Sequence, residues 1–265
     1  MIHPVAINMW LGMAIELATL AILMASLTAY QRLHPLAPET SRKLFHIGGG
    51  LTTLALPWLF ASAWPILLLT AITIPALLVL KYVRALKGNL GAVLYRVDRK
   101  SFGEIYFPVS VCLLFVLAHG NALLFIIPIL MLTLADPAAA VIGGHYGRLR
   151  YTMMKGQKSI EGSVAFFLVA FLCTLLPLHL FTVTNGIETL LIATIVGLLV
   201  MIVEAIAWEG LDNLFIPVTG FFLLDTLLHL DVQALLIQLV VSVLLLVTAF
   251  CWHGQNLAMR EKKPC

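Results

Sequence analysis

Several short stretches of this sequence contain charged residues, some with glycines beside them, in patterns that could bind a phosphorylated ligand. Residues 136–147 read DPAAAVIGGHYG, and they follow fourteen residues, 122–135, in which Thr133 is the only polar side chain. The carboxylate beside a proline predicts a broken helix, because proline disfavours helical geometry at the residue before it. We therefore expect Asp136 to cap a new helix at the membrane edge, where broken helices hold ions. Capping without any further role is the plainer alternative.

The glycines after Asp136 have the composition of an anion site. Gly143, Gly144 and Gly147 would let backbone N–H groups approach a phosphate closely. Bases that could neutralise the phosphate follow between residues 148 and 158. Composition alone is equally typical of an ordinary helix end followed by a basic loop.

The segment KSIEGS, which begins at Lys158, favours the anion site. A helix that enters the membrane here would direct its positive N-terminal end toward the loop, with Ser159 as its cap. Gly162 and Ser163 would keep its first turn narrow. Lys158 supplies charge at that end, and Glu161 is a candidate magnesium ligand. The G-x-x-x-x-G-K spacing of a Walker A loop is absent before Lys158.

Further charged residues lie near the ends of apolar runs. The segment RKLFH places Arg42, Lys43 and His46 on one helical face, since residues three and four apart are neighbours. Two anchoring bases and a packed histidine are the alternative. Glu104 opens one apolar run, and Glu204 lies near the end of another. Two oxygen donors that would suit a hard cation, or serve as helix caps, follow in EGLDN: Asp212 and Asn213.

The composition identifies the elements that must position these residues. Hydrophobic residues make up 61% of the 265 and charged residues 11%, whereas a soluble domain carries roughly 25% charged residues. The apolar runs have helix length rather than the short alternating pattern of a barrel. We therefore expect one all-α domain, residues 1–265, built as a polytopic membrane helical bundle. Nine spans are predicted, at about 5–30, 45–60, 64–82, 104–118, 122–142, 161–181, 188–207, 214–230 and 232–252.

The basic residues predict the orientation of the bundle. All sixteen lysines and arginines lie in 32–43, 81–100, 148–158 and 260–263. If nine spans alternate, these segments share one side of the membrane, which the positive-inside rule makes cytoplasmic. We therefore expect the N-terminus outside, the C-terminus inside and any chemistry at the cytoplasmic face.

Five of these stretches together resemble the CTP-dependent lipid-alcohol kinases, which include dolichol, phytol and polyprenol kinases and related diacylglycerol kinases. They are SRKLFH, GEIYFP, LADPAAAVIGGHYGR, KSIEGSVAFF and EAIAWEGLDN, in the family's order, between about residues 41 and 213. The resemblance implies transfer of the γ-phosphoryl group of CTP, or of another nucleoside triphosphate, to a long-chain alcohol, with magnesium.

The resemblance also implies roles for single positions. Arg42 and Lys43 match a basic pair that the family needs, and with Lys158 they would stabilise the transferred phosphoryl group. We expect Asp136 to be the first magnesium ligand, with Glu161 or Asp212 second. The general base stays open. The implied nucleotide site comprises Asp136, Gly143, Gly147, Lys158, Glu161 and Gly162, with Gly144, Ser159 and Ser163 beside them.

Two other functional classes remain open. A phosphatidate cytidylyltransferase would also use CTP and magnesium in a membrane, but it would release pyrophosphate. A secondary transporter would use Asp136 and Glu204 as ion ligands, although the sequence shows no pair of related halves. The expected partners are a lipid alcohol and a nucleotide, without nucleic acid. The expected location is the cell membrane of a prokaryote, or an endoplasmic reticulum or plastid membrane.

Overall fold

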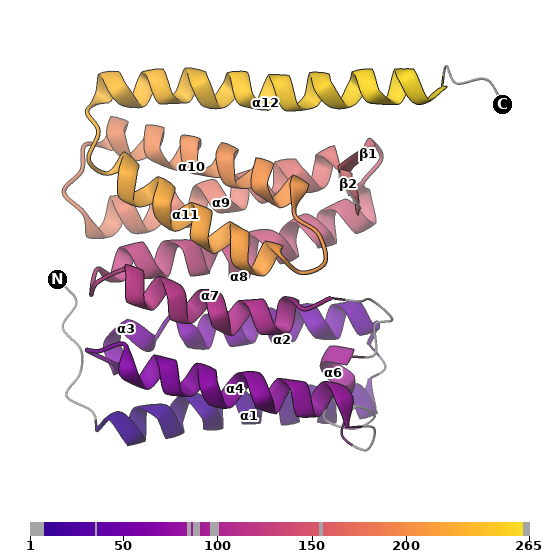
Figure 1. Ribbon diagram of the computed structural model, residues 1–265, viewed down its shortest axis with the longest axis vertical. Helices are drawn as coiled ribbons and strands as arrows, with labels where there is room; N and C mark the ends of the chain where they lie inside the picture. Colours follow the sequence, from indigo (N-terminus) through magenta and orange to yellow (C-terminus); the bar gives the residue numbers. More distant parts are fainter. Residues whose placement is uncertain are drawn as a thin grey trace.

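The structure, a computed structural model, describes residues 8–34, 36–83, 86, 91–95, 101–153 and 156–261. Its helices are stacked side by side, with α1 and α4 at one end of the stack and α12 at the other (Figure 1). The helices are α1 (Met9–Leu33), α2 (Pro38–Thr53), α3 (Leu56–Leu59), α4 (Trp64–Tyr82), α6 (Ala92–Tyr95), α7 (Gly103–Leu117), α8 (Ala122–Tyr146), α9 (Ile160–Phe181), α10 (Gly186–Ile206), α11 (Asp212–Leu227) and α12 (Val232–Glu261). The strands β1 (Arg150–Met153) and β2 (Gly156–Ser159) form a hairpin.

The helical class is confirmed, and several helices could cross a membrane. Within the described ranges, α1, α4, α8, α9, α10 and α12 are long and apolar enough to do so. This indicates an integral membrane protein. The apolar helix α7 is shorter, with 15 residues. The remaining predicted spans coincide with α2 and α3 and with α11, so the number nine and the orientation stay predictions.

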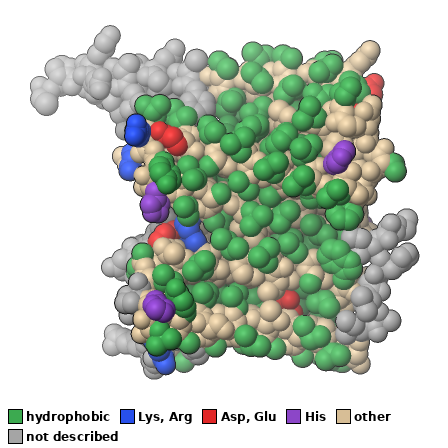
Figure 2. Space-filling view, turned by 180° about the vertical axis from the view of Figure 1, so that it is seen from behind, with side chains coloured by type: hydrophobic (Ala, Val, Ile, Leu, Met, Phe, Trp, Pro, Cys, Tyr) green, Lys and Arg blue, Asp and Glu red, His purple; other side chains and the backbone are tan. Residues whose placement is uncertain are grey.

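The basic side chains are not spread evenly over the surface. Figure 2 shows a broad face covered by hydrophobic side chains, while the visible lysines and arginines lie along one edge. The hairpin, α6 and the start of α2 lie at the corresponding end of the helices (Figure 1). The lysines and arginines visible in Figure 2 therefore lie together at one end of the helices. Bases of the predicted grouping that lie outside the described residues are Arg84, Lys87, Arg96, Arg99, Lys100, Lys155, Lys262 and Lys263.

The predicted helix break at Asp136 is wrong. Helix α8 runs without interruption through Asp136 and Pro137. An internal proline removes one backbone hydrogen bond. However, α8 packs against α2, α9 and α11, and this packing holds the two halves of the helix in line. Asp136 therefore projects from a continuous helix, and helix capping does not explain its presence.

The segment between the predicted spans 122–142 and 161–181 contains regular structure. Its first residues complete α8, and β1 and β2 then pair in antiparallel register with Tyr151 opposite Lys158. The predicted cap of the next helix is confirmed, since Ser159 Oγ accepts a hydrogen bond from the N–H of Gly162 at 3.1 Å. The hairpin therefore holds Lys158 next to the start of α9.

A close helix contact brings the basic pair toward Asp136. A Cβ atom at Gly50 would overlap the side chain of Thr133, so α2 and α8 approach more closely there than larger residues allow. Because the two helices pack together, the face of α2 with Arg42 and Lys43 lies beside α8. The site described next is built on this contact.

Candidate functional site

A polar cavity of about 670 Å³ lies where α2, α8, α9, α10 and α11 meet the hairpin. Its volume is within the range of small-molecule sites. It contains side chains of both charges, so a ligand here would meet cations and carboxylates together. The bases that line it are Arg42, Lys43, Arg150 and Lys158, and the carboxylates are Glu39, Asp136, Glu204, Glu209 and Asp212.

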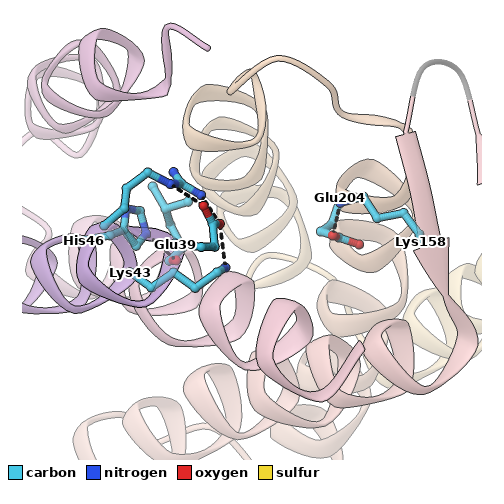
Figure 3. Close-up of polar contacts among 7 residues, drawn as sticks. Glu39, Lys43, His46, Lys158 and Glu204 are labelled. Carbon is cyan, nitrogen blue, oxygen red and sulfur yellow. Dashed lines mark hydrogen bonds and ion pairs between the residues drawn. The ribbon is translucent and has the colours of Figure 1, made fainter. Parts of the chain in front are cut away.

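The basic pair on α2 is held by a carboxylate that the sequence analysis missed. Arg42 donates two hydrogen bonds to Glu39, from Nε at 3.2 Å and from Nη2 at 2.7 Å. The Lys43 ammonium lies 3.9 Å from the same carboxylate, and Figure 3 shows Glu39 and Lys43 facing each other. The planar fork of an arginine binds phosphate as readily as carboxylate. Glu39 thus occupies contacts that an anionic ligand would need.

A second ion pair lies across the cavity. Lys158 Nζ donates to Oε1 of Glu204, whose side chain is almost fully buried (Figure 3). Burial acts to lower the pKa of Lys158, but the charge and hydrogen bond of Glu204 outweigh it, and the pKa is raised. Lys158 therefore carries a positive charge at neutral pH. Glu204 is its counter-ion.

Two carboxylates in the cavity differ from the others. In the part of the chain that the structure describes, neither Asp136 nor Asp212 is in a salt bridge. Lys43 and Lys158 line the same cavity as Asp136. Oδ1 of Asp212 accepts the N–H of Asn213 at 3.0 Å. Both carboxylates line the space where a ligand would sit.

This pair fits the requirements of magnesium. Magnesium commonly takes one or two protein carboxylates and completes its shell with substrate phosphates and water. Among the described residues, no group of three or more His, Cys, Asp or Glu side chains could hold a metal without such help. A metal bound here would therefore depend on the oxygens of a phosphorylated ligand.

The glycines divide into packing positions and one open position. A Cβ at Gly143 would lie 2.9 Å from Ser159 Oγ, and one at Gly162 would lie 2.9 Å from the carbonyl oxygen of Ala139. These glycines let α8 and α9 approach. Gly144 also lines the cavity, but a Cβ there would have no atom within 4 Å. Its backbone is the one most open to a ligand.

Two predicted nucleotide-site residues do not line the cavity. Oε1 of Glu161 accepts the backbone N–H groups of Arg148 at 3.0 Å and Leu149 at 3.2 Å. A Cβ at Gly147 would overlap the carbonyl oxygen of Gly143. Both residues therefore shape the connection between α8 and β1. Their contact with a nucleotide stays a prediction.

The remaining members of the predicted site are brought together. Ser159 and Ser163 line the polar cavity at the start of α9. The hydroxyl groups of Ser163 and Tyr151 are 2.6 Å apart, and burial raises the pKa of Tyr151, which keeps its phenol protonated. Four other residues of this cavity were not predicted: Glu39 and Gln157 stand outside the motifs, and Trp208 and Glu209 lie within EAIAWEGLDN but were given no role. The i, i+3 and i, i+4 spacing of Glu39 to the basic pair could have indicated it.

A second cavity, of about 480 Å³, lies among α1, α2, α4 and α7. Most of its lining is aliphatic or aromatic, as for a hydrocarbon ligand. Arg42 lines both cavities, and it is therefore the junction between them. Three predicted candidates line the apolar cavity rather than the polar one: His46, Glu104 and Asn213.

Two carboxylates reach the apolar cavity, and each has a partner. Glu104 accepts a hydrogen bond from Lys81, which also donates to the carbonyl oxygen of Ser101 at 2.8 Å, so this cluster joins α4 to α7. Glu16 accepts from Thr52 Oγ1 at 3.0 Å. Glu16 was not predicted as a site residue, although no other charged residue occurs in the first apolar run.

The helices indicate an integral membrane protein, and within it a polar cavity adjoins an apolar one. The chain is 27% identical, over 217 residues, to a protein of Synechocystis sp. named phytol kinase. The match covers 81% of this chain and 91% of that protein. This similarity supports the resemblance to lipid-alcohol kinases that the motifs carry. No family model and no solved structure matches the chain.

Proposed function

We propose that this protein transfers the γ-phosphoryl group of CTP, or of another nucleoside triphosphate, to the hydroxyl group of a long-chain isoprenoid alcohol. The observation that carries the proposal is the junction of the polar and apolar cavities at Arg42. A soluble nucleotide and a lipid need sites of opposite polarity, and the reacting groups must meet. The similarity to a protein named phytol kinase supports an isoprenoid substrate.

The polar cavity would bind the triphosphate. Arg42 and Lys43 would exchange their carboxylate partner, Glu39, for phosphate oxygens, which arginine binds in the same bidentate manner. Lys158 and the N-terminal end of α9 would neutralise charge from the other side. Phosphoryl transfer depends mainly on such positioning and charge stabilisation.

Asp136 and Asp212 are the residues that we propose to hold magnesium with the nucleotide. When bound, magnesium would supply positive charge that offsets the negative charge of the phosphates. The paired carboxylates are less suited to this role, because Glu39 and Glu204 each neutralise a base. Asp136 and Asp212 have no such partner among the described residues.

The apolar cavity would bind the alcohol. Its tail would lie among α1, α2, α4 and α7, and its hydroxyl group would reach Arg42. The polar cavity adjoins the hairpin, at the end of the helices where the positive-inside rule predicts the cytoplasm. We therefore propose that the reaction takes place at the cytoplasmic face.

The test uses purified protein in lipid vesicles with a prenyl alcohol, magnesium and CTP labelled at either the α or the γ phosphorus. We expect label from γ-labelled CTP in the lipid, and none from α-labelled CTP. Transfer of the α label would instead indicate a cytidylyltransferase. Failure of both labels to reach the lipid, with ATP and GTP also inactive as donors, would contradict the proposal. Diacylglycerol in place of the prenyl alcohol tests the alternative lipid substrate.

A further inference from the structure

His46 has one ring nitrogen whose role is set by its hydrogen-bond partner. It lies on α2 and lines the apolar cavity, with Nε2 3.1 Å from the carbonyl oxygen of Leu132 on α8. A carbonyl oxygen can only accept, so Nε2 must carry the hydrogen. In the neutral ring the other nitrogen, Nδ1, is then an acceptor with a free lone pair.

The ring is held in place while Nδ1 remains available. Phe107, which also lines the apolar cavity, packs edge-on against the ring of His46 at 5.5 Å between centroids and an interplanar angle of 67°. Within the part of the chain that the structure describes, no hydrogen bond joins Nδ1 to another residue. The contacts with Leu132 and Phe107 therefore orient the imidazole and leave one basic atom unpartnered.

The position of His46 suits a group that acts on the alcohol. It follows Arg42 by four residues on one face of α2, which places it about 6 Å further along the helix. Arg42 lines both cavities, whereas His46 lines only the apolar one. An alcohol whose hydroxyl group reaches Arg42 from the apolar cavity therefore passes His46.

Other ionisable groups at the junction are less suited to accept a proton. A guanidinium such as that of Arg42 stays protonated in proteins. The carboxylates of Glu39, Asp136 and Asp212 line only the polar cavity, and the last two are the proposed magnesium ligands. The carboxylate of Glu104 is engaged by Lys81.

We propose that His46 is the general base of the transfer, an inference that rests on the proposed kinase function. The hydroxyl proton of the alcohol passes to Nδ1 while the alcohol oxygen forms a bond to the γ-phosphorus. The bond from that phosphorus to the β,γ-bridging oxygen breaks, and the nucleoside diphosphate leaves with its electron pair. The imidazolium then releases the proton to water. His46 is a catalytic residue in this account.

The substitution His46→Gln separates catalysis from packing. The glutamine amide can still donate to Leu132 from near the position of Nε2, but it has no basic atom at the position of Nδ1. A general base contributes typically 10²–10⁴-fold. We expect kcat to fall within that range, with the Kd of the nucleotide and the thermal midpoint in detergent unchanged. The matched control is His145→Gln on α8, because His145 is exposed, lines neither cavity and should be replaceable without loss.

A second variant, His46→Ala, provides a measurement that does not depend on the glutamine side chain. Added imidazole should restore turnover in proportion to its concentration, and more basic substituted imidazoles should restore it more. Near-normal kcat in folded His46→Gln, or absence of rescue in His46→Ala, would overturn the assignment of the base. If the wild-type protein itself transfers no γ label to an alcohol, the proposed function fails instead.

Discussion

The polar and the apolar cavity are lined by opposite kinds of side chain, although both reach Arg42. In the polar cavity, two carboxylates are paired with bases, Glu39 with Arg42 and Glu204 with Lys158. In the apolar cavity, the few polar groups are tied to neighbouring helices, as Glu16 is to Thr52. The difference teaches that the packing of these helices keeps a charged space and an apolar space apart while joining them at one residue.

Because the two cavities share only Arg42 among their described lining residues, mutations can address each cavity separately. A change confined to one cavity should alter the binding of one substrate, whereas a change at the junction should alter the reaction of both. When no ligand is bound, Glu39 is the partner of Arg42 and Lys43, and Glu204 is the partner of Lys158. A phosphate that replaces Glu39 exchanges one charged hydrogen-bond partner for another, so Arg42 and Lys43 are not left unpaired at any stage.

The largest loss should come from Asp136→Asn. Asparagine matches the shape of aspartate but lacks the charge that a magnesium ligand supplies. Because Asp136 lies inside α8, no helix cap is lost, and the thermal midpoint should change little. We expect turnover to fall by on the order of 10³-fold, with little recovery at excess CTP. Turnover and thermal midpoint should be measured together. An active variant would exclude Asp136 as a ligand and leave Asp212.

The basic pair tests the junction itself. Replacing Arg42 with Ala removes a residue that lines both cavities, so turnover should fall by about 10²-fold and the KM of both substrates should change. Replacing Lys43 with Ala should lower turnover by a similar factor but change only the KM of the nucleotide, since Lys43 lines only the polar cavity. Steady-state kinetics with each substrate varied in turn gives the answer. Near-normal activity of both variants would indicate that the pair only anchors α2.

Two glycines allow a matched test of separability. Gly49 lines the apolar cavity, and a Cβ there would meet only Leu20, at 3.7 Å. Gly144 lines the polar cavity and has open space at the same position. We expect Gly49→Leu to raise the KM of the alcohol by about tenfold with kcat unchanged, and Gly144→Leu to do the same for the nucleotide. If either variant changes both KM values equally, the two cavities are not separate sites.

The smallest effect on turnover should come from Glu161→Gln. The glutamine carbonyl can still accept the N–H groups of Arg148 and Leu149, although more weakly than a carboxylate. We expect a small loss of stability and unchanged turnover. Chemical denaturation and the label-transfer assay measure the two quantities. A large loss of turnover in a stable variant would place Glu161 at the metal after all.

The helices were predictable because their apolar runs are long, and Ser159 was predictable because a short polar residue precedes one of those runs. The course of α8 was not. The Asp136–Pro137 pair is a local signal for a break, and packing on three neighbouring helices outweighs it. The hairpin was missed because its strands have only four residues each and show no clear alternation.

The candidate site was only partly predictable for a related reason. Motif positions such as Arg42 and Lys158 could be recognised from their types and neighbours in the sequence. The ion pair of Lys158 with Glu204 joins residues that are 46 positions apart, and only the fold brings them together. The two cavities likewise arise from the packing of helices. Local patterns therefore indicated the chemistry, while the division between a polar and an apolar site required the structure.

An experimental structure with a non-hydrolysable CTP analogue, magnesium and a prenyl alcohol tests the central claim most directly. We expect the γ-phosphate beside Arg42 and Lys43 in the polar cavity, and the alcohol tail among α1, α2, α4 and α7. The alcohol oxygen should lie between Arg42 and Nδ1 of His46. A nucleotide bound outside the polar cavity, or a tail bound between other helices, would contradict it.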